Sequence, residues 1–411
     1  MLPVQEAEQI ILDLVVPLNV QKDTEIVNLQ SARGRILAKS ISSKLDFPYW
    51  DNSAMDGYAV RYEDVQQATQ ETPVTLEIVE EIAAGLVPQK TISSQQTARI
   101  FTGAMLPEGA DTIVIQENTQ RNGKLVTIFS SPQPQQFVRH RGSFYQAGET
   151  MLESGIALDA PDIAVLATAQ CNELTVYRRP NIAILSTGDE LVTPDTPLKP
   201  GQIVDSNQYA LGSFVTGNGA TPIFLGIVPD RPEKLKKAMA QAIAEADIVL
   251  STGGVSVGDY DYVDSILEEL GGQIHIRSVA VKPGKPLTVA SFQNSCLYFG
   301  IPGNPVSALV SCWRFVQPAI KKLSGLKNNW QPTFIKAVTK HKLRSAGKRE
   351  TYLWGKLNIV EGVPEFSLAG GSHSSGNLIN LSQTNALAVV PIGQTSIAIG
   401  ESIRVMLTKQ L

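Results

Sequence analysis

Two segments of the chain place carboxylates directly after a Ser-Thr-Gly turn. The first, STGDEL, supplies Asp189 and Glu190 and follows an apolar run at 182–185. The second, STGGVSVGDYD, supplies Asp259 and Asp261 after another apolar run. Carboxylates repel a phosphate group unless a divalent cation lies between them. A single Asp in such a place is more often a helix N-cap, but two sets favour a metal-bridged site for an anionic ligand.

The second turn also carries a glycine pair that suits phosphate binding. Gly253 and Gly254 can adopt backbone angles that are closed to other residues, and they let a ligand approach the backbone amides. Such amides at the start of a helix form a cradle for an anion. A tight strand-to-helix connection would explain a lone glycine pair equally well, but the loop runs on to Gly258 and two aspartates, which favours a ligand.

Two further loops carry groups that suit an oxyanion. In VKPGKPLTV, Pro283 and Gly284 form a turn that is flanked by Lys282 and Lys285. Lysines in a turn are usually solvated, but flanking prolines make this loop rigid, which suits anion binding better. In GIPGNPVSALV, a Pro-Gly-Asn-Pro loop opens a helix that carries Ser307. We expect both loops at the same sheet edge as the Ser-Thr-Gly turns.

A third group of polar residues lies near the N-terminus. FPYWDNSAMDGYAVR places Asp51 and Asp56 beside the aromatic residues Trp50 and Tyr58. A structural loop would explain the glycine and asparagine of this segment, but it explains the two carboxylates less easily. RIFTGAM adds Thr102 in a polar turn at the end of a strand.

The elements that must position these residues alternate between strands and helices from residue 180 onward. The expected strands are 182–185, 223–228, 248–250 and 274–281 with two more after them, and the expected helices are 208–215, 232–244, 262–270 and 306–322. Such alternation predicts a mostly parallel sheet that is covered on both faces. Ligands of these sheets bind beyond the carboxyl ends of the strands, where both Ser-Thr-Gly turns lie.

The rest of the chain predicts three flanking parts around this central domain. Helices are expected at 4–14, 32–38 and 160–169, with a β-rich insertion between the second and the third. Short strands after residue 330 predict a small C-terminal β domain. The fold class is therefore a multidomain α/β protein with a mostly parallel three-layer central domain. The predicted domains are 1–45 plus 140–178 (N-terminal, helical), 46–139 (inserted, β-rich), 179–326 (α/β) and 327–411 (C-terminal, β).

The composition limits the class of protein. With 411 residues, 43% of them apolar and 18% charged, the chain is long enough for two to four ordered domains. A net charge of -4 without a basic run argues against nucleic acid as a partner. No basic leader opens the chain and no apolar stretch reaches roughly eighteen residues, so we expect a cytoplasmic protein that does not enter the membrane. Three cysteines without a CxxC spacing and four scattered histidines give little support for disulfides, thiolate metal sites or Ser-His catalysis.

These segments together resemble the MoeA family of molybdopterin molybdenumtransferases, which also includes the E domain of gephyrin. Six motifs occur in the family's order: DNSAMDGYAV, FTGAMLPEGADTIVIQE, STGDEL, GGVSVG, KPGKP and PGNPVSA. The resemblance covers nearly the whole chain, and six motifs in order are specific although each alone is weak or moderate. It implies a four-domain homodimer whose central region is shared with pterin adenylyltransferases.

The resemblance also implies a reaction and its participants. Adenylylated molybdopterin and molybdate would give molybdenum cofactor and AMP, with Mg2+ as the divalent cation. The glycine turns would then hold phosphates, the carboxylates would hold the metal, and Lys282 and Lys285, helped by Ser307, would hold molybdate. Molybdopterin adenylyltransferase and molybdoenzymes would be possible protein partners.

The family's site residues map onto matching positions of this chain. The resemblance implies four catalytic residues, Asp56, Thr102, Glu190 and Asp261, and two of these, Glu190 and Asp261, as metal ligands. The residues implied to bind substrate are Gly253, Gly254, Ser256, Lys282, Lys285, Pro302, Pro305, Ser307, Asp230 and Arg349. In the family the N-terminal region of the partner subunit lines the pocket, so Asp56 would act at the other chain's sheet edge.

Two positions depart from the family pattern. Phe144 stands where an acidic residue is common, and Asp264 stands where a lysine is frequent. Both departures change the charge near the expected site. Two other functions therefore stay open, a non-catalytic dimeric scaffold of the same fold and an adenylyltransferase that acts one step earlier. Intact Lys282 and Glu190 speak against the scaffold, and the long N-terminal part and the C-terminal β domain speak against the adenylyltransferase.

Overall fold

The computed structural model describes residues 1–253 and 262–409. The chain forms two compact units, which we describe separately. Unit 1 contains Met1–Lys39, Ser154–Ile163 and Asn172–Leu411, and unit 2 contains Ser40–Glu153 and Ala164–Cys171. No helix in the described part of the chain is long and apolar enough to cross a membrane.

Unit 1 is built on a six-stranded sheet with the strand order β16-β13-β17-β21-β20-β18. Its strands are β13 (Asn181–Thr187), β16 (Thr221–Val228), β17 (Ile248–Thr252), β18 (Gln273–Ser278), β20 (Pro286–Ser291) and β21 (Leu297–Ile301). The first four strands in this order run parallel, whereas β20 runs antiparallel to both β21 and β18. The predicted mostly parallel sheet is confirmed.

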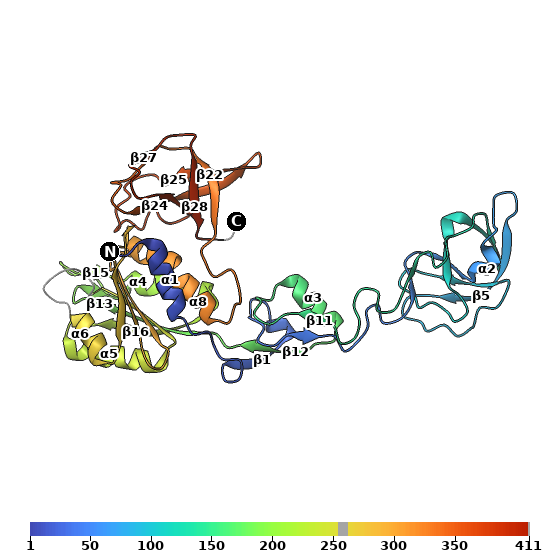
Figure 1. Ribbon diagram of the computed structural model, residues 1–411, viewed down its shortest axis with the longest axis horizontal. Helices are drawn as coiled ribbons and strands as arrows, with labels where there is room; N and C mark the ends of the chain where they lie inside the picture. Colours follow the sequence, from blue (N-terminus) through green and yellow to red (C-terminus); the bar gives the residue numbers. More distant parts are fainter. Residues whose placement is uncertain (254–261, 410–411) are drawn as a thin grey trace. The chain divides into compact units, whose positions relative to one another are not determined.

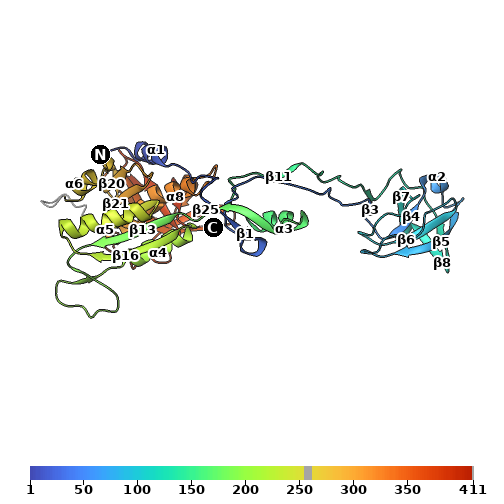
Figure 2. The ribbon, with the colours of Figure 1, turned by 90° about the horizontal axis from the view of Figure 1, so that it is seen from below.

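Helices cover both faces of this sheet because its central strands are apolar on both sides. In β13, Ile182 and Ile184 face one helical layer, and Ala183 and Leu185 face the other. The first layer contains α1 (Val4–Leu14), α4 (Asn207–Gly217) and a long helix made of α7 (Pro305–Ser311), the π-helical segment η3 (Cys312–Val316) and α8 (Gln317–Leu323). The second layer contains α5 (Pro232–Glu245) and α6 (Tyr262–Glu269). Figure 2 shows α5 and α4 on opposite faces around β13 and β16.

The C-terminal part of unit 1 forms a small closed β barrel. Its strands are β22 (Phe334–Thr339), β24 (Glu350–Val360), β25 (Val363–Leu368), β26 (Ala386–Val390) and β28 (Ser402–Leu407), with the short pair β23 (Leu343–Arg344) and β27 (Ser396–Ile397). The order is β24-β25-β22-β28-β26, and β26 pairs again with β24 to close the ring. Tyr352 and Trp354 pack in the same apolar core as α1 and the long helix, so the barrel rests on the helical layer of the α/β sheet (Figure 1).

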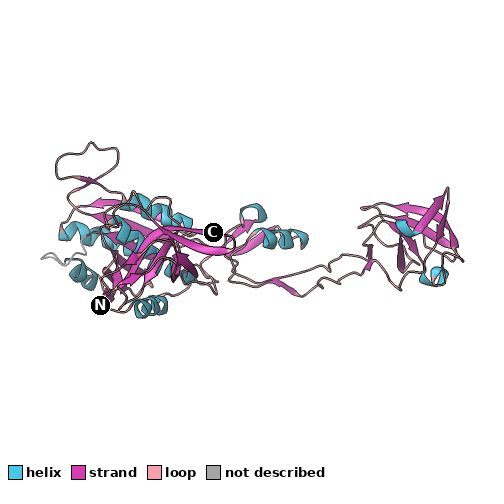
Figure 3. Ribbon diagram, turned by 90° about the horizontal axis from the view of Figure 1, so that it is seen from above, coloured by secondary structure: helices cyan, strands magenta, loops and turns pink. Residues whose placement is uncertain are grey.

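Unit 2 is built on a second six-stranded sheet, with the order β7-β4-β6-β5-β9-β8. Its elements are β4 (Gly57–Val60), α2 (Tyr62–Val65), β5 (Val74–Ile82), β6 (Gln96–Ile100), β7 (Thr112–Ile115), η2 (Gln116–Asn118), β8 (Thr119–Asn122) and β9 (Leu125–Ile128). The predicted hairpin is present, with Gly123 at a φ of +61° in the turn between β8 and β9. Figure 3 shows that the regular elements of this unit are mainly strands, joined by long loops.

The N-terminal part is less helical than the sequence predicted. Besides α1 it contains α3 (Ala160–Thr168) and three pairs of short strands: β1 (Thr24–Asn28) with β12 (Glu173–Tyr177), β2 (Ile41–Ser42) with β11 (Thr150–Leu152), and β3 (Asn52–Ser53) with β10 (Val138–Arg139). The predicted helix at 32–38 is wrong. Gly34 has a φ of +73°, which interrupts a helix, and Ile36 and Leu37 form β-bridges to Ala157 and Val176 instead. The 3-10 helix η1 (Leu29–Ser31) precedes this segment.

Candidate active site

The two Ser-Thr-Gly turns leave neighbouring strands of the unit 1 sheet. β13 ends at Thr187 and β17 ends at Thr252, and Ser186 lies opposite Thr252 in this parallel pair. The Thr252 hydroxyl donates a hydrogen bond to Ser186 Oγ at 3.2 Å. From β13 the chain continues through α4 to one side of the sheet, and from β17 it continues through α6 to the other side. The turns therefore lie at a switch point of the strand order, where sheets of this type bind ligands.

Gly253 brings the second turn close to both neighbouring loops. Its φ is +86°, and an added Cβ would lie 2.2 Å from the carbonyl oxygen of Thr187. A Cβ on Gly303, in the Pro-Gly-Asn-Pro loop, would lie 3.6 Å from Gly253 Cα. Three loops therefore meet at this edge, and the space between the first two admits only glycine.

An acidic group lies beside the first turn. The backbone nitrogen of Asp230 donates to Asp189 Oδ1 at 3.3 Å, and a Cβ on Gly188 would lie 2.7 Å from Glu190 Oε2. Partial desolvation, together with the charges of Asp189 and Glu190, raises the pKa of Asp230, although the nearby Thr187 hydroxyl acts against this shift. Repulsion among carboxylates is what a bound cation would relieve. In the described part of the chain, however, no three acidic, histidine or cysteine side chains form a metal site by themselves.

The lysine loop lies at the same edge. β20 begins at Pro286 and runs antiparallel to β21, so the residues that precede it lie beside the carboxyl end of β21. Lys282 and Lys285 are exposed, whereas Gly284 is buried between them. An added Cβ on Gly284 would lie 2.8 Å from Ser311 Oγ, so the loop rests directly on α7. Both ammonium groups are consequently presented to solvent from a tightly packed turn.

The C-terminal barrel supports this loop. The expected strand at 274–281 is divided, because β18 ends at Ser278 and the short β19 (Val281–Lys282) turns away to pair with the start of β24. Arg349 adds a hydrogen bond from Nη1 to the carbonyl oxygen of Val281 at 3.2 Å. Arg349 therefore lies next to the lysine loop, although the two segments are far apart in the sequence.

The Pro-Gly-Asn-Pro loop leads from β21 into α7. Pro305 is the first residue of α7, where its missing N–H would have no helical partner. Pro302 is buried, and Ser307 is only 4% exposed, so its side chain packs within the helix layer and not on the surface.

A loop of the barrel covers the start of α7. The backbone nitrogen of Val306 donates to the carbonyl oxygen of Ser375 at 3.0 Å. Ser375 belongs to the segment AGGSHSSGNLINL, which was not among the expected site segments. The high glycine and serine content of this segment is the sequence feature that could have indicated a loop at the site. The structure adds this segment to the edge formed by the turns and the lysine loop.

Comparisons with known proteins agree with this arrangement. Residues 2–169 match the MoeA N-terminal region (domain I and II), residues 183–322 match a probable molybdopterin binding domain, and residues 336–408 match the MoeA C-terminal region (domain IV). A molybdopterin molybdenumtransferase from Nostoc is 58% identical over 405 residues, which cover 98% of this chain and 93% of the relative. The chain belongs to the MoeA family.

More distant members of the family also match this chain over nearly its full length. A molybdopterin molybdenumtransferase from Haemophilus influenzae is 37% identical over 386 residues, which cover 93% of each chain. The crystal structure of a molybdopterin biosynthesis MoeA protein from Pyrococcus horikoshii superimposes with a TM-score of 0.85 at 28% identity and covers 99% of this chain and 100% of that one. The predicted family and multidomain α/β fold are confirmed.

The MoeA motif residues of unit 2 contact one another. Asp56 Oδ1 accepts hydrogen bonds from the backbone nitrogen of Thr102 at 2.7 Å and from its hydroxyl at 2.8 Å. These bonds lower the pKa of Asp56, and the charge of Arg99 adds to the effect. The Arg99 guanidinium in turn lies over the rings of Tyr58 and Phe101, at 5.0 Å from each centroid. Asp56 and Thr102 thus form one hydrogen-bonded pair that favours the carboxylate form of Asp56.

The two departures from the MoeA pattern have different surroundings. Phe144 is 62% exposed, and its ring centroid lies 5.5 Å from that of Phe47 in an aromatic cluster of unit 2. Asp264 accepts a hydrogen bond from Arg277 Nε at 2.6 Å, so its charge is compensated by a neighbouring strand. Phe144 is thus an exposed aromatic residue, and Asp264 is part of an ion pair at the start of α6.

Three of the implied site residues cannot be placed. Gly254, Ser256 and Asp261 lie outside the described residues. The others fall into two groups: Asp56 and Thr102 belong to unit 2, and the remaining positions line the edge of the unit 1 sheet or its supporting loops.

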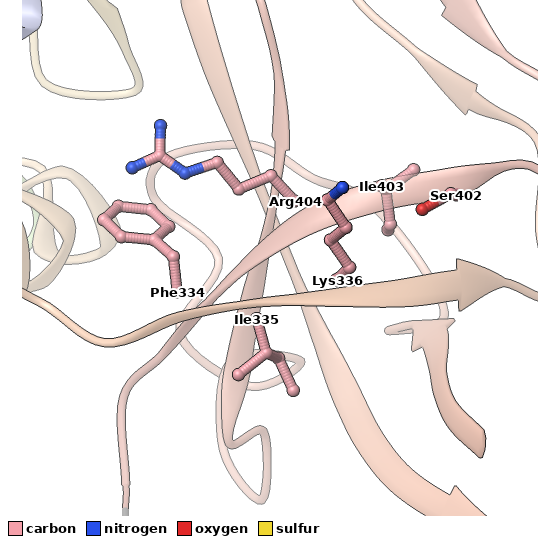
Figure 4. Close-up of a pocket in the computed structure, with 6 residues that line it drawn as sticks. All are labelled: Phe334, Ile335, Lys336, Ser402, Ile403 and Arg404. Atoms are coloured by element: carbon pink, nitrogen blue, oxygen red, sulfur yellow. The ribbon is translucent and has the colours of Figure 1, made fainter.

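A shallow pocket on the barrel is separate from these motifs. It is lined by residues of β22 and β28, namely Phe334, Ile335, Lys336, Ser402, Ile403 and Arg404. The Arg404 guanidinium lies 3.6 Å from the centroid of the Phe334 ring. Figure 4 shows Phe334, Lys336 and Arg404 on one side of the two strands and Ile335 on the other. None of these residues was implied as a site residue.

Proposed function

We propose that this MoeA family member inserts molybdenum from molybdate into adenylylated molybdopterin and releases AMP and molybdenum cofactor. The observation that carries the proposal is the meeting of both Ser-Thr-Gly turns at the switch point of the sheet, beside two exposed lysines. An edge of this kind offers backbone amides to phosphates and ammonium groups to a second oxyanion. The names of the relatives from Nostoc and Haemophilus influenzae support the same reaction.

Each loop has a distinct task in the proposed reaction. Gly253 lets the second turn pack against the Thr187 carbonyl, and we assign the phosphates of the substrate to this turn. Lys282 and Lys285 bind molybdate as point charges from a loop whose glycine is seated on α7. Arg349 and β24 hold this loop, so that molybdate is bound at a fixed place relative to the pterin.

The acidic group is the proposed site for Mg2+. Magnesium is usually bound by one or two carboxylates together with substrate phosphate oxygens, and Glu190, Asp189 and Asp230 supply suitable hard oxygen donors. Partial burial, with the charges of Asp189 and Glu190, raises the pKa of Asp230, and a cation at this place would offset those charges. When bound, the ion would offset the phosphate charge and polarise the linkage that is cleaved.

We also propose that the protein is a homodimer in which Asp56 of one chain serves the site of its partner. The support is that Asp56, a residue of the family's motif, accepts two hydrogen bonds from Thr102, which lower its pKa. Sedimentation of the purified protein tests the dimer directly. A molybdopterin adenylyltransferase that supplies the substrate and molybdoenzymes that accept the cofactor are the proposed protein partners.

The decisive experiment follows AMP release from adenylylated molybdopterin with and without molybdate. We expect release that depends on molybdate, and we expect Glu190→Gln to lower its rate by at least about tenfold. Glu245→Gln is the matched control, because Glu245 is the last residue of α5 and accepts a hydrogen bond from Gln241 of the same helix. Consumption of ATP with free molybdopterin would instead indicate the adenylyltransferase, and no reaction in either assay would indicate the scaffold.

A further inference from the structure

The carboxamide of Asn207 is only half satisfied at the edge of the unit 1 sheet. Asn207 is the first residue of α4, directly after the connection that leaves the first Ser-Thr-Gly turn. It is 7% exposed, and its Nδ2 donates to the carbonyl oxygen of Gly303 at 2.8 Å. Its Oδ1 is also buried, but it accepts no hydrogen bond within the described part of the chain. Buried acceptors without a partner are rare in native proteins and call for an explanation.

The asparagine that caps the C-terminal end of α4 shows the usual arrangement. Asn218, at the other end of α4, donates from Nδ2 to the carbonyl oxygen of Phe214 at 2.7 Å and accepts at Oδ1 from Gln317 Nε2 at 2.8 Å. Both halves of its carboxamide are therefore used. Of the two asparagines at the ends of α4, only Asn207 has an unmatched acceptor among the described residues.

The position of Asn207 connects its open acceptor to the candidate site. Gly303, whose carbonyl oxygen accepts the hydrogen bond from Asn207 Nδ2, lies in the Pro-Gly-Asn-Pro loop. It packs close to Gly253. Asp205, two residues before Asn207, fixes the first turn of α4, because its Oδ1 accepts a hydrogen bond from the backbone nitrogen of Gln208 at 3.2 Å. The acceptor is therefore held rigidly at the meeting point of the loops that surround the switch point.

We infer that Asn207 Oδ1 binds an N–H or O–H donor of the substrate, and that Asn207 thereby fixes the orientation of the ligand next to the phosphate-binding turn. The inference rests on the proposed function, because adenylylated molybdopterin carries such donors on its pterin ring, on its ribose and on adenine. A carbonyl oxygen can only accept hydrogen bonds, so it selects for the donor-bearing part of the ligand and not for a phosphate or for molybdate.

Calorimetric titration of the purified protein distinguishes a ligand contact from a structural tie. The probes are AMP, 2′-deoxy-AMP, 3′-deoxy-AMP, purine riboside monophosphate, which lacks the adenine amino group, and molybdopterin without a nucleotide. The variants are Asn207→Ala, Asn207→Asp, which keeps an acceptor but cannot donate to Gly303, and the control Asn218→Ala. Thermal unfolding checks that each variant is folded before titration.

If the donor belongs to the nucleotide, one analogue that lacks it will bind the parent protein about three- to tenfold more weakly than AMP. This ratio should fall to about one in Asn207→Ala and should persist in Asn207→Asp and Asn218→Ala. If the donor belongs to the pterin, Asn207→Ala should weaken molybdopterin binding by a similar factor and leave AMP binding unchanged.

Two results would overturn the inference. Equal losses for AMP, every analogue and molybdopterin in Asn207→Ala would show that the side chain only ties α4 to the neighbouring loop. Unchanged affinities for all probes would show that Oδ1 faces no ligand. If the parent protein binds neither AMP nor molybdopterin, the proposed function fails, and the inference fails with it. This result differs from one in which the parent binds these probes and substitution of Asn207 has no effect.

Discussion

The guanidinium of Arg314 in the long helix donates a hydrogen bond from Nε to the hydroxyl of Tyr352 in β24, at 3.0 Å. The same guanidinium pairs with Glu8 of α1 through Nη1 at 2.6 Å. The Tyr352 hydroxyl donates onward to Glu350, which precedes the residue that pairs with Lys282. Arg314 is 2% exposed. One buried polar network therefore joins α1, the long helix and the strand that supports the lysine loop.

Tyr352→Phe should destabilise unit 1. Removal of the hydroxyl leaves a buried Arg314 N–H without its partner, so we expect the free energy of unfolding to fall by about 1–3 kcal/mol. Urea unfolding followed by circular dichroism measures the change. Tyr209→Phe on the outer face of α4 is the control, because Tyr209 is 54% exposed. Equal midpoints for the two variants would mean that the network adds no stability.

Gly253→Ala should abolish or strongly impair the reaction. The new Cβ would meet the Thr187 carbonyl at 2.2 Å in a conformation with positive φ, so the turn must move. Gly226→Ala is the matched control, because Gly226 has a φ of +77° but nothing within 4 Å of an added Cβ. We expect the control to lose only about 1–2 kcal/mol of stability from backbone strain and to keep its activity. Comparable activities in the two variants would argue against a role for the turn.

Asp230→Asn should stabilise the protein at neutral pH and lower its activity. The pKa of Asp230 is raised above 3.8, so the folded state binds its proton more tightly than the unfolded state does. The ionised side chain therefore lowers stability as the pH rises through the folded-state pKa, and the neutral amide avoids this effect. Thermal unfolding from pH 3 to pH 7 measures it. We expect a higher melting temperature than the parent at pH 7 and no difference well below pH 3.8. A lower melting temperature for Asp230→Asn than for the parent at pH 7 would show that the ionised Asp230 side chain does not destabilise the folded protein.

Lys282→Ala and Lys285→Ala should weaken the use of molybdate more than the binding of the pterin substrate. A hydrogen bond to a charged group contributes about 1.5–3 kcal/mol, so we expect half-saturating molybdate to rise about tenfold or more. Titration of molybdate in the AMP release assay measures this, with Lys336→Ala of the barrel pocket as the control. If the half-saturating molybdate concentration is unchanged in both variants, the two lysines do not bind molybdate.

Phe144→Asp tests the departure from the family pattern. Phe144 is 62% exposed, so the substitution should leave the fold intact. If the segment lies over a metal site, a restored carboxylate should reduce the magnesium concentration needed for half-maximal turnover. Magnesium titration of both proteins measures it. Phe144→Ser is the control for loss of the aromatic ring. Equal magnesium dependence of the parent and both variants would show that residue 144 does not contribute to metal binding.

The sequence predicted local elements well where apolar spacing and turn residues agreed. The strands that flank the Ser-Thr-Gly turns, the hairpin at Gly123 and the start of α7 at Pro305 were all foreseen within a few residues. In each case the signal for the element lies in residues that are neighbours in the sequence. The placement of both turns at one edge also followed, because parallel strands bring their carboxyl ends together.

Contacts between distant segments were not foreseen. The helix expected at 32–38 is an extended segment that bridges to Ala157 and Val176, and nothing within the segment itself indicates those partners. Glu8 and Arg314 are separated by 306 residues, so neither residue predicts the other. The division of the strand at 274–281 depends on pairing with β24 for the same reason. The contact of Ser375 with Val306 likewise depends on how the barrel packs.

The closure of the barrel has a consequence for how the protein is made. β28 pairs with both β22 and β26, and it follows every other strand of the barrel along the chain. During synthesis from the N-terminus, the central sheet can therefore assemble while the barrel is still an open, incomplete ribbon. β19 pairs with β24, and β24 belongs to this ring through its pairing with β26. A chain that ends before β28 would carry the motifs at the edge of the unit 1 sheet but would lack the strand that joins β22 to β26, and we expect its barrel to support the lysine loop less firmly.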